Sequence, residues 1–315
     1  MYYDDKKKKK KGTIGIVAKS LKENWLIFKE EKIGIIGLAL IIFFLIFGLL
    51  LPAYEHAMGP EEYNPLVGMD LDLNRNPVTG TFSHPPSKAH PLGTDFKGSD
   101  LLAQLMNGSQ MAFLVGIVVA LSSVAIGTVV GLVSGYYGGS LIDSLLMRIS
   151  EIILSLPLLP LVIVVAAVLG RLSIWGLVFV LAILLWPNTA KIIRSQTLSL
   201  RERPYVESAR VAGASGFRIM FRHLAPNVLP LSIVYMTLNV TSAILIEASV
   251  SFLGFGDPTK VSWGMMLQWC KTQGHLFKAL WWMLPPGGCI GLLCMAFYFV
   301  GTAMMPIINP SLRKR

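Results

Sequence analysis

Long uncharged apolar stretches constrain this chain more than any other feature of its sequence. A helix needs about 20 apolar residues to cross a hydrocarbon core of about 30 Å. Each charged side chain at the centre of such a helix costs about 2.5 to 3.5 kcal/mol. Six stretches are long enough and contain no Asp, Glu, Lys or Arg, namely residues 33–51, 111–135, 152–170, 172–190, 228–246 and the middle of 279–309. The sequence therefore predicts an all-α membrane protein with six transmembrane helices.

The overall composition agrees with a membrane protein. Of the 315 residues, 53% are hydrophobic and only 15% are charged, compared with about 25% charged residues in soluble domains. The net charge of +10 could suggest nucleic acid, but its basic clusters border hydrophobic stretches, so membrane topology and anionic lipid explain them. The three cysteines show neither a disulfide framework nor metal-ligand spacing. We expect a lipid bilayer as surroundings, no nucleic-acid partner and no metal site.

The distribution of basic residues predicts the orientation, because Lys and Arg are retained on the cytoplasmic side. With the N-terminus inside, 21 of the 28 Lys and Arg fall in inner segments. Both termini are then cytoplasmic, which requires an even number of spans. The predicted division is a basic tail with an interfacial helix at 1–32, a first transmembrane helix at 33–51, an external loop at 52–110, a five-helix core at 111–308 with a cytoplasmic loop at 191–227, and a cytoplasmic tail at 309–315.

Two helical patterns lie outside the apolar stretches. Before the first span, apolar residues recur at helical spacing, at Ile14, Val17, Leu21, Trp25 and Phe28. This pattern predicts an amphipathic helix lying on the inner membrane surface, with Trp25 at the interface. An ordinary cytoplasmic helical extension is the alternative. In the external loop, turn-forming residues predict a mostly irregular segment that ends where Ser99 caps a new helix and Asp100 lies near its positive end.

Small residues recur every fourth position along the second span, at Ser123, Gly127, Gly131 and Gly135. Such a stripe lets another helix approach closely, and packing of this kind drives helix association in lipid. We expect the stripe to serve packing within the subunit. A contact between subunits is the alternative.

The loop at 191–227 is the only long loop between spans that is predicted on the cytoplasmic side. Val206, Ala209, Arg210 and Gly213 fall at helical intervals, and a basic amphipathic stretch follows Gly216. We expect a short helix, a glycine break and a second short helix at 217–223 that ends at Pro226. Together they would project a compact knob from the membrane.

This loop resembles the cytoplasmic signature of binding-protein-dependent ABC importer permeases. Glu207, Ala209, Gly213 and Pro226 stand at the matching positions, whereas Ser208, His223 and Ala225 depart from the pattern. Further matches narrow the resemblance to permeases of dipeptide, oligopeptide and nickel importers, namely His90-Pro91-Leu92-Gly93-Thr94-Asp95 with Gly98, Asp100 and Gly108, then Gly135-Tyr136-Tyr137-Gly138-Gly139 with Asp143 and Arg148, Glu247 with Ser251-Phe252-Leu253-Gly254, and Ser262-Trp263-Gly264.

The resemblance implies a six-helix permease of the type I ABC importer kind in the cell membrane of a prokaryote. Its knob would be a coupling helix that docks onto an ATPase subunit through Glu207, Ser208, Ala209, Arg210, Gly213, Gly216 and Pro226. The chain itself would be no enzyme and would carry no catalytic residue or cofactor, since two partner ATPase subunits would bind ATP and Mg²⁺. The other implied partners are a second homologous permease subunit and an external substrate-binding protein.

The cargo and its path are less constrained by the sequence. Peptide is the leading choice, with oligosaccharides or nickel complexes as alternatives for the same machinery. We expect the path to be lined by polar residues of the fifth span, namely Thr237, Asn239, Thr241 and Ser242. Glu247, near the outer end of that span, is a further candidate for the path, but we favour a structural hydrogen bond for it. An ATP-independent secondary transporter or channel would normally show ion-coupling residues or internal repeats. An intramembrane enzyme would need ionisable or nucleophilic groups facing one another at membrane depth.

Overall fold

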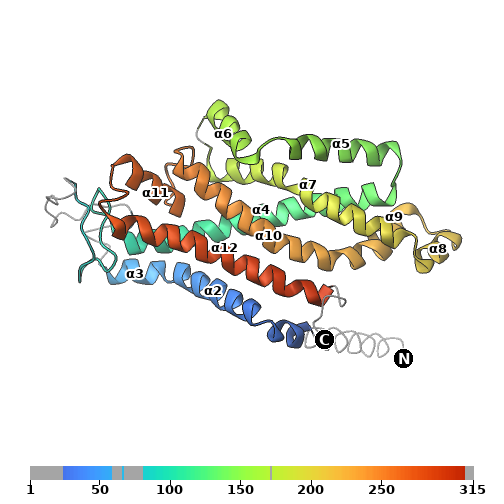
Figure 1. Ribbon diagram of the computed structural model, residues 1–315, viewed down its shortest axis with the longest axis horizontal. Coiled ribbons are helices and arrows are strands. Elements are labelled where there is room, and N and C mark those ends of the chain that lie inside the picture. Colours follow the sequence, from blue (N-terminus) through green and yellow to red (C-terminus); the bar gives the residue numbers. More distant parts are fainter. Residues whose placement is uncertain (1–23, 59–65, 67–80, 171, 309–315) are drawn as a thin grey trace, which may run out of the picture.

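The computed structural model describes residues 24–58, 66, 81–170 and 172–308, and its long helices lie side by side in one elongated bundle (Figure 1). Helix α8 lies at one end of the bundle and α11 lies towards the other, and we call these the α8 end and the α11 end. The helices are α2 (Lys32–Leu49), α3 (Leu51–Ala57), α4 (Leu101–Tyr136), α5 (Leu141–Ser155), α6 (Leu158–Leu169), α7 (Ile174–Arg201), α8 (Pro204–Val211), α9 (Gly216–Arg218), the π-helical turn η1 (Ile219–Leu224), α10 (Ala225–Phe252), α11 (Trp263–Thr272) and α12 (Leu280–Ile308).

The described residues contain six membrane spans if one broken pair of helices counts as a single span. Five helical runs are long and apolar enough to cross a bilayer, namely α2, α4, α7, the run Gly216–Phe252 and α12. The third predicted span is divided into α5 and α6, which are bent by 85° with respect to each other. The break lies at Leu156 and Pro157, which have extended backbones, because the residue before a proline is disfavoured in the α conformation. The span predicted at 152–170 is therefore divided at Pro157 and not continuous.

Helix α4 is longer than the apolar stretch that predicted it. It begins at Leu101 and has 36 residues, or about 54 Å at 1.5 Å per residue, so it extends well beyond a hydrocarbon core. Its N-cap is Asp100, whose Oδ1 accepts from the Ala103 amide at 2.9 Å, and the prediction of a Ser99 cap was wrong. Ser99 instead donates its amide to Asp95 Oδ1. The segment 52–110, which was predicted as an external loop, thus contains all but the first residue of α3 and the first turns of α4.

The small-residue stripe of α4 packs against α7 of the same chain. A Cβ atom at Gly127 would lie 2.7 Å from the Trp186 carbonyl oxygen, and one at Gly131 would lie 2.5 Å from the Ala190 carbonyl oxygen. One at Gly135 would lie 2.5 Å from Thr197 Cβ. Real Cβ atoms do not approach this closely, so glycine is what allows the two helices to touch. The prediction that the stripe serves packing within the subunit is confirmed.

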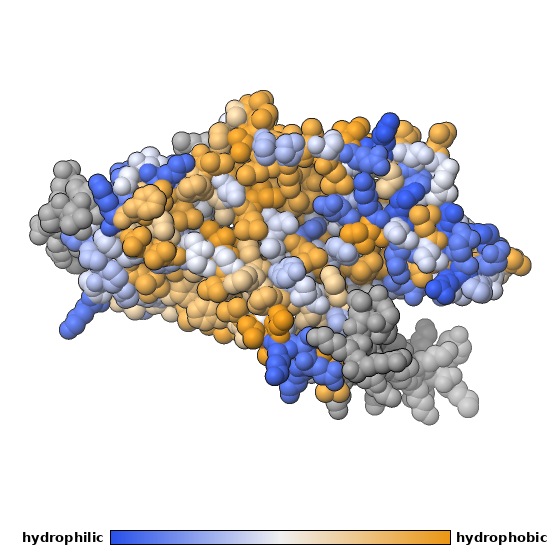
Figure 2. Space-filling model, viewed as in Figure 1, coloured by the Kyte–Doolittle hydropathy of each residue, from blue (hydrophilic) through white to orange (hydrophobic). Residues whose placement is uncertain are grey.

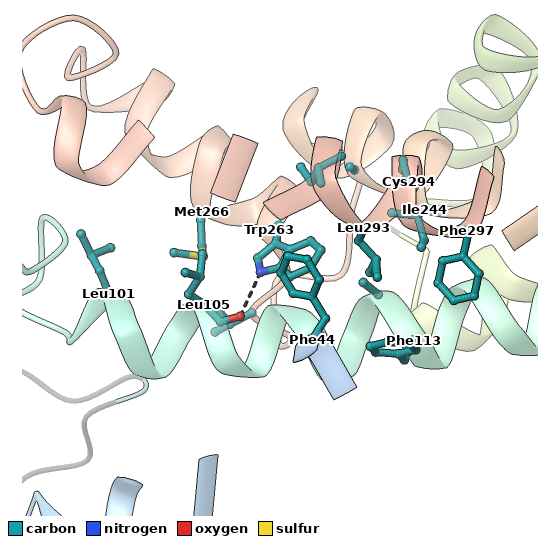
Figure 3. Packing of buried hydrophobic residues seen from close by; sticks show 14 of the residues in the cluster. Phe44, Leu101, Leu105, Phe113, Ile244, Trp263, Met266, Leu293, Cys294 and Phe297 are labelled. Atoms are coloured by element: carbon teal, nitrogen blue, oxygen red, sulfur yellow. Dashed lines mark hydrogen bonds between the residues drawn. The ribbon is translucent and has the colours of Figure 1, made fainter. Parts of the chain in front are cut away.

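A cluster of aromatic and aliphatic side chains joins α2, α4, α10, α11 and α12 (Figure 3). At its centre Trp263 of α11 is buried, contacts the Phe44 ring edge-on at 5.6 Å between centroids, and donates from Nε1 to the Leu105 carbonyl at 2.9 Å. Gly108 lies directly under the Trp263 ring, so a side chain there would collide with the indole. This cluster holds the α11 end of the bundle together.

The surface of the bundle is apolar along its middle and hydrophilic at the α8 end (Figure 2). Large apolar side chains such as Phe43, Leu145 and Phe179 are more than 50% exposed, as expected for surfaces that face lipid or other subunits. Residues 24–30 of the predicted amphipathic segment are helical, and the exposed Trp25 ring stacks on the buried Phe28 ring. The remainder of that segment lies outside the described residues.

The glycine contacts predict a position-specific effect of alanine. We expect Gly131→Ala to destabilise the detergent-solubilised protein by about 1 to 3 kcal/mol, because the added methyl group must displace the α7 backbone. Gly291→Ala on α12 is the matched control, since a Cβ atom there would meet no atom within 4 Å and alanine favours the helix. Denaturant titration followed by circular dichroism measures both variants. Equal stability of the two variants would contradict the close α4–α7 contact.

Candidate functional site

Residues 204–216 form a knob that protrudes at the α8 end (Figure 1). One apolar side chain, Val206, is fully buried and anchors α8 in a cluster with Leu132, Ile193 and Leu224. The tip is open, and Val211 is 83% exposed. Tyr205 on α8 and Phe217 directly after the knob are exposed as well, and several exposed apolar side chains on one protrusion suit a surface that another protein covers.

The turn after α8 is a Schellman motif, which ends a helix by two specific hydrogen bonds. The Ala214 amide donates to the Ala209 carbonyl and the Gly213 amide donates to the Arg210 carbonyl, each at 3.0 Å. Gly213 has φ +79°, a conformation that side chains disfavour and glycine adopts readily. The expected glycine break at Gly213 is therefore confirmed, and it makes a rigid turn rather than a loose one.

The chain returns to the membrane through a continuous helix and not through a separate short one. Ser215 caps this helix, accepting from the Arg218 amide at 3.3 Å, and the run from Gly216 continues into α10. The prediction of a second short helix that ends at Pro226 was therefore wrong. Pro226 lies exposed in the first turn of α10, directly after the π-helical turn η1. Because proline clashes with the carbonyl four residues earlier and has no amide hydrogen, it accounts for the widened turn.

The remaining predicted coupling residues lie on the knob. Glu207, Ser208 and Arg210 are not enclosed by the chain, and Ala209 is half-buried. The Ser208 hydroxyl donates to the Pro204 carbonyl at 2.8 Å within the same helix. Glu207 in the first turn and Arg210 in the last turn are also placed favourably for the dipole of α8. The open face of α8 thus offers one carboxylate and one guanidinium beside small side chains.

Two features beside the knob were not predicted from the sequence. Asp143 of α5 forms a bidentate ion pair with Arg194 of α7, with N–O distances of 2.6 and 2.7 Å. It also accepts a hydrogen bond from the Ser134 hydroxyl. Arg201, the last residue of α7, lies against the carbonyls at the C-terminal end of α4. Asp143 belonged to a motif of the resemblance, but nothing in the sequence indicates its partner 51 residues away.

The predicted path residues of α10 differ in their surroundings. Asn239 is buried and donates to Ser123 and Thr189, so it joins α10 to α4 and α7. Thr237 is buried and bonds within α10. Thr241 donates to the Cys294 carbonyl of α12 at 3.3 Å. The half-buried Ser242 donates to the Leu238 carbonyl of its own helix at 3.4 Å.

Glu247 and the outer sequence motifs meet at the α11 end. Oε1 of the buried Glu247 accepts from Ser251 at 2.7 Å and from Ser262 at 2.8 Å, which joins α10 to the start of α11. Nearby, His90 Nδ1 lies 2.9 Å from Asp100 Oδ2. Burial raises the pKa of Asp95 above its ordinary value, although Gln104 donates to it at 2.8 Å. These buried polar groups hold the segment before α4 in a fixed shape.

Comparison with known proteins gives consistent matches over most of the chain. Residues 127–314 match the family model described as binding-protein-dependent transport system inner membrane component. The dipeptide transport system permease protein DppC of Haemophilus influenzae is 34% identical over 295 residues, which cover 93% of this chain and 96% of that protein. The oligopeptide transport system permease protein OppC of Bacillus subtilis is 30% identical over 294 residues, which cover 93% of this chain and 90% of that protein. A peptide permease protein of Brucella suis biovar 1 is 38% identical over 226 residues, which cover 71% of this chain and 74% of that protein.

Taken with the all-helical bundle, its membrane spans and the knob at one end, these matches classify the molecule. Peptide permeases of this kind are the non-catalytic membrane subunits of ABC importers. The chain belongs to the family of binding-protein-dependent transport system inner membrane components, among the permeases of peptide ABC importers.

Proposed function

We propose that this permease forms half of the translocation path of a peptide importer and that its knob receives the movement of an ATPase subunit. The exposed knob carries this proposal, because it presents an apolar tip and both signs of charge at the hydrophilic end of the bundle. In this assembly two ATPase subunits bind ATP and Mg²⁺. A second, homologous permease completes the path, and an external binding protein delivers the cargo.

The proposed orientation places the α8 end and both termini in the cytoplasm. Four arginines lie on or next to the knob on the α8 side, namely Arg201, Arg203, Arg210 and Arg218. Basic residues that border membrane spans are retained on the cytoplasmic side. The α11 end, with its ordered motif before α4, then faces outward, where a binding protein would arrive.

For the path itself we propose the α10 side chains that are not fully enclosed by the chain's own packing. Thr241 and Ser242 are half-buried, so a partner subunit or cargo can reach them. Thr237, Asn239 and Glu247 are buried here and would reach the path only if α10 rotates during transport. Peptide is the proposed cargo because the relatives DppC and OppC are named for dipeptide and oligopeptide transport.

Uptake by the whole importer tests this function. We expect proteoliposomes that contain both permeases and the ATPase subunits to import a labelled peptide when ATP is enclosed and the binding protein is added outside. Uptake should stop without ATP even when proton and sodium gradients are imposed. Uptake driven by a gradient alone would overturn the proposal in favour of a secondary transporter. Import of a labelled oligosaccharide or nickel complex in place of peptide would overturn the proposal that peptide is the cargo.

Gly213→Pro tests the rigid turn of the knob. Proline fixes φ near −65° and removes the amide that donates to Arg210, so the turn at φ +79° cannot form. We expect peptide import per ATP hydrolysed to fall about tenfold or more while membrane insertion is retained. Gly170→Pro is the matched control, since Gly170 also has a positive φ of 82° but lies at the end of α6. Wild-type coupling in Gly213→Pro would refute the docking role.

Glu207→Arg tests the charge on the exposed face of α8. Reversing this carboxylate places a like charge where the ATPase groove would have a complementary one, so we expect about tenfold weaker ATPase association. Glu151→Arg provides the control, because Glu151 is also exposed but lies on α5. Co-purification of the ATPase subunits across a salt series measures the effect. If the Glu207 variant associates as strongly as the wild type at every salt concentration, Glu207 does not contribute to the interface.

A further inference from the structure

We propose that Arg201 is a positioning residue that ties the knob to the C-terminal end of α4, so that movement of the knob reaches α4 directly. The inference rests on the proposed docking role of the knob and extends it. The chain itself connects the knob only to α7 and α10. Any direct effect on α4 must pass through side-chain contacts, and Arg201 makes the most specific of these.

The guanidinium of Arg201 lies where the backbone of α4 ends. Its Nη1 is 3.4 Å from the Gly135 carbonyl oxygen and 3.2 Å from those of Tyr136 and Gly138. The last carbonyls of a helix have no partner within the helix and carry its partial negative charge, so a cation is favoured there. A side chain at Gly138 would come within 2.8 Å of Nη1, so the glycine keeps this place open.

Arg201 is also next to the knob in the chain. It is the last residue of α7, and α8 begins at Pro204. Its Nε donates to the exposed carboxylate of Glu202 at 2.9 Å, which holds the guanidinium from the other side. A displacement of the entry to the knob must therefore either carry the end of α4 with it or break these contacts.

The segment that leads from the knob back to α10 begins at Gly216, and we call it the returning arm. It touches the same end of α4. A Cβ atom at Gly216 would lie 3.1 Å from the Tyr136 hydroxyl oxygen, so the first turn of α9 packs directly against the Tyr136 ring. The end of α4 thus lies between the entering and the returning arms of the knob. Arg201 contacts it by hydrogen bonds, and Gly216 contacts it by packing.

Helix α4 is suited to carry such a displacement to the far end of the bundle. It is a single helix of 36 residues, and its N-terminal half is fixed to α11 by the Trp263–Leu105 hydrogen bond. Asn107 also donates to the Val261 carbonyl, just before α11, at 2.7 Å. A rigid helix that is bound at both ends moves both ends together. The knob would in this way influence the α11 end without passing through α10.

The experiment measures two readouts in the assembled importer with Arg201→Gln, Arg201→Lys and the control Arg148→Gln. Arg148 is an exposed arginine of α5 in the same half of the bundle. The first readout is labelled peptide imported per ATP hydrolysed. The second is the ATP-dependent change in thiol labelling of Leu121→Cys on α4 and Leu245→Cys on α10, both of which replace exposed leucines.

We expect Arg201→Gln to lower the import per ATP by about threefold or more and to abolish the ATP-dependent change at position 121 while retaining it at 245. Arg201→Lys should restore much of the import per ATP and much of the labelling change at position 121, because an ammonium group still interacts favourably with the carbonyls of α4. Arg148→Gln should match the wild type. A residue that serves stability alone would alter both labelling positions alike, so equal loss at 121 and 245, or an unchanged response in Arg201→Gln, overturns the inference.

Cross-linking of Val211→Cys to the ATPase separates this inference from the proposal on which it rests. If the protein with Val211→Cys as its only substitution forms no cross-link, the docking role of the knob is refuted, and the proposed role of Arg201 is refuted with it. If the cross-link forms equally in Arg201→Gln but coupling and α4 labelling remain as in the wild type, only the role of Arg201 is refuted.

Discussion

The close contact between α4 and α7 determines the arrangement of the α8 half of the bundle. In lipid, helices associate through packing and interhelical hydrogen bonds rather than through burial of apolar surface from water. The glycines of α4 allow this contact and thereby fix which face of α7 turns inward. Within this contact Arg194 meets Asp143, and one turn beyond it Arg201 meets the end of α4. The two arginines are positioned by glycines that carry no chemistry themselves.

The same constraint explains where the polar side chains lie. A polar group inside a bilayer needs a partner from the protein. Asn239 finds Ser123 and Thr189, and Ser109 donates to the Phe44 carbonyl at 2.7 Å. Of these residues, Asn239 is a candidate for the path when only the sequence is known. In the structure their hydrogen bonds join neighbouring helices, which leaves fewer polar groups of α10 available to a partner subunit.

The sequence predicted those features that depend on local patterns. Uncharged stretches indicated the spans, and Gly213 marked a turn that only a positive φ can make. Hydropathy alone does not reveal the bend between α5 and α6, because Pro157 lies within an unbroken apolar run. The start of α4 at Leu101 was predicted from its capping residues, although the cap is Asp100 and not Ser99, because Ser99 is held by Asp95 instead. The Arg201 contact joins residues more than 60 positions apart, and no local pattern encodes such a distance.

The two arms of the knob differ in stiffness, which bears on how force would pass through it. The entering arm is the part of α7 that follows Pro187, an α-helical segment held at its last residue by the Arg201 contacts. The returning arm contains the π-helical turn, where the Ala225 amide bonds to Met220 and the Asn227 side chain donates to the His223 carbonyl at 2.6 Å. A widened turn with a side-chain donor deforms more readily than an uninterrupted helix. A push on α8 would therefore move α7 and α4 together as one stiff unit, while the returning arm bends and lets α10 follow separately.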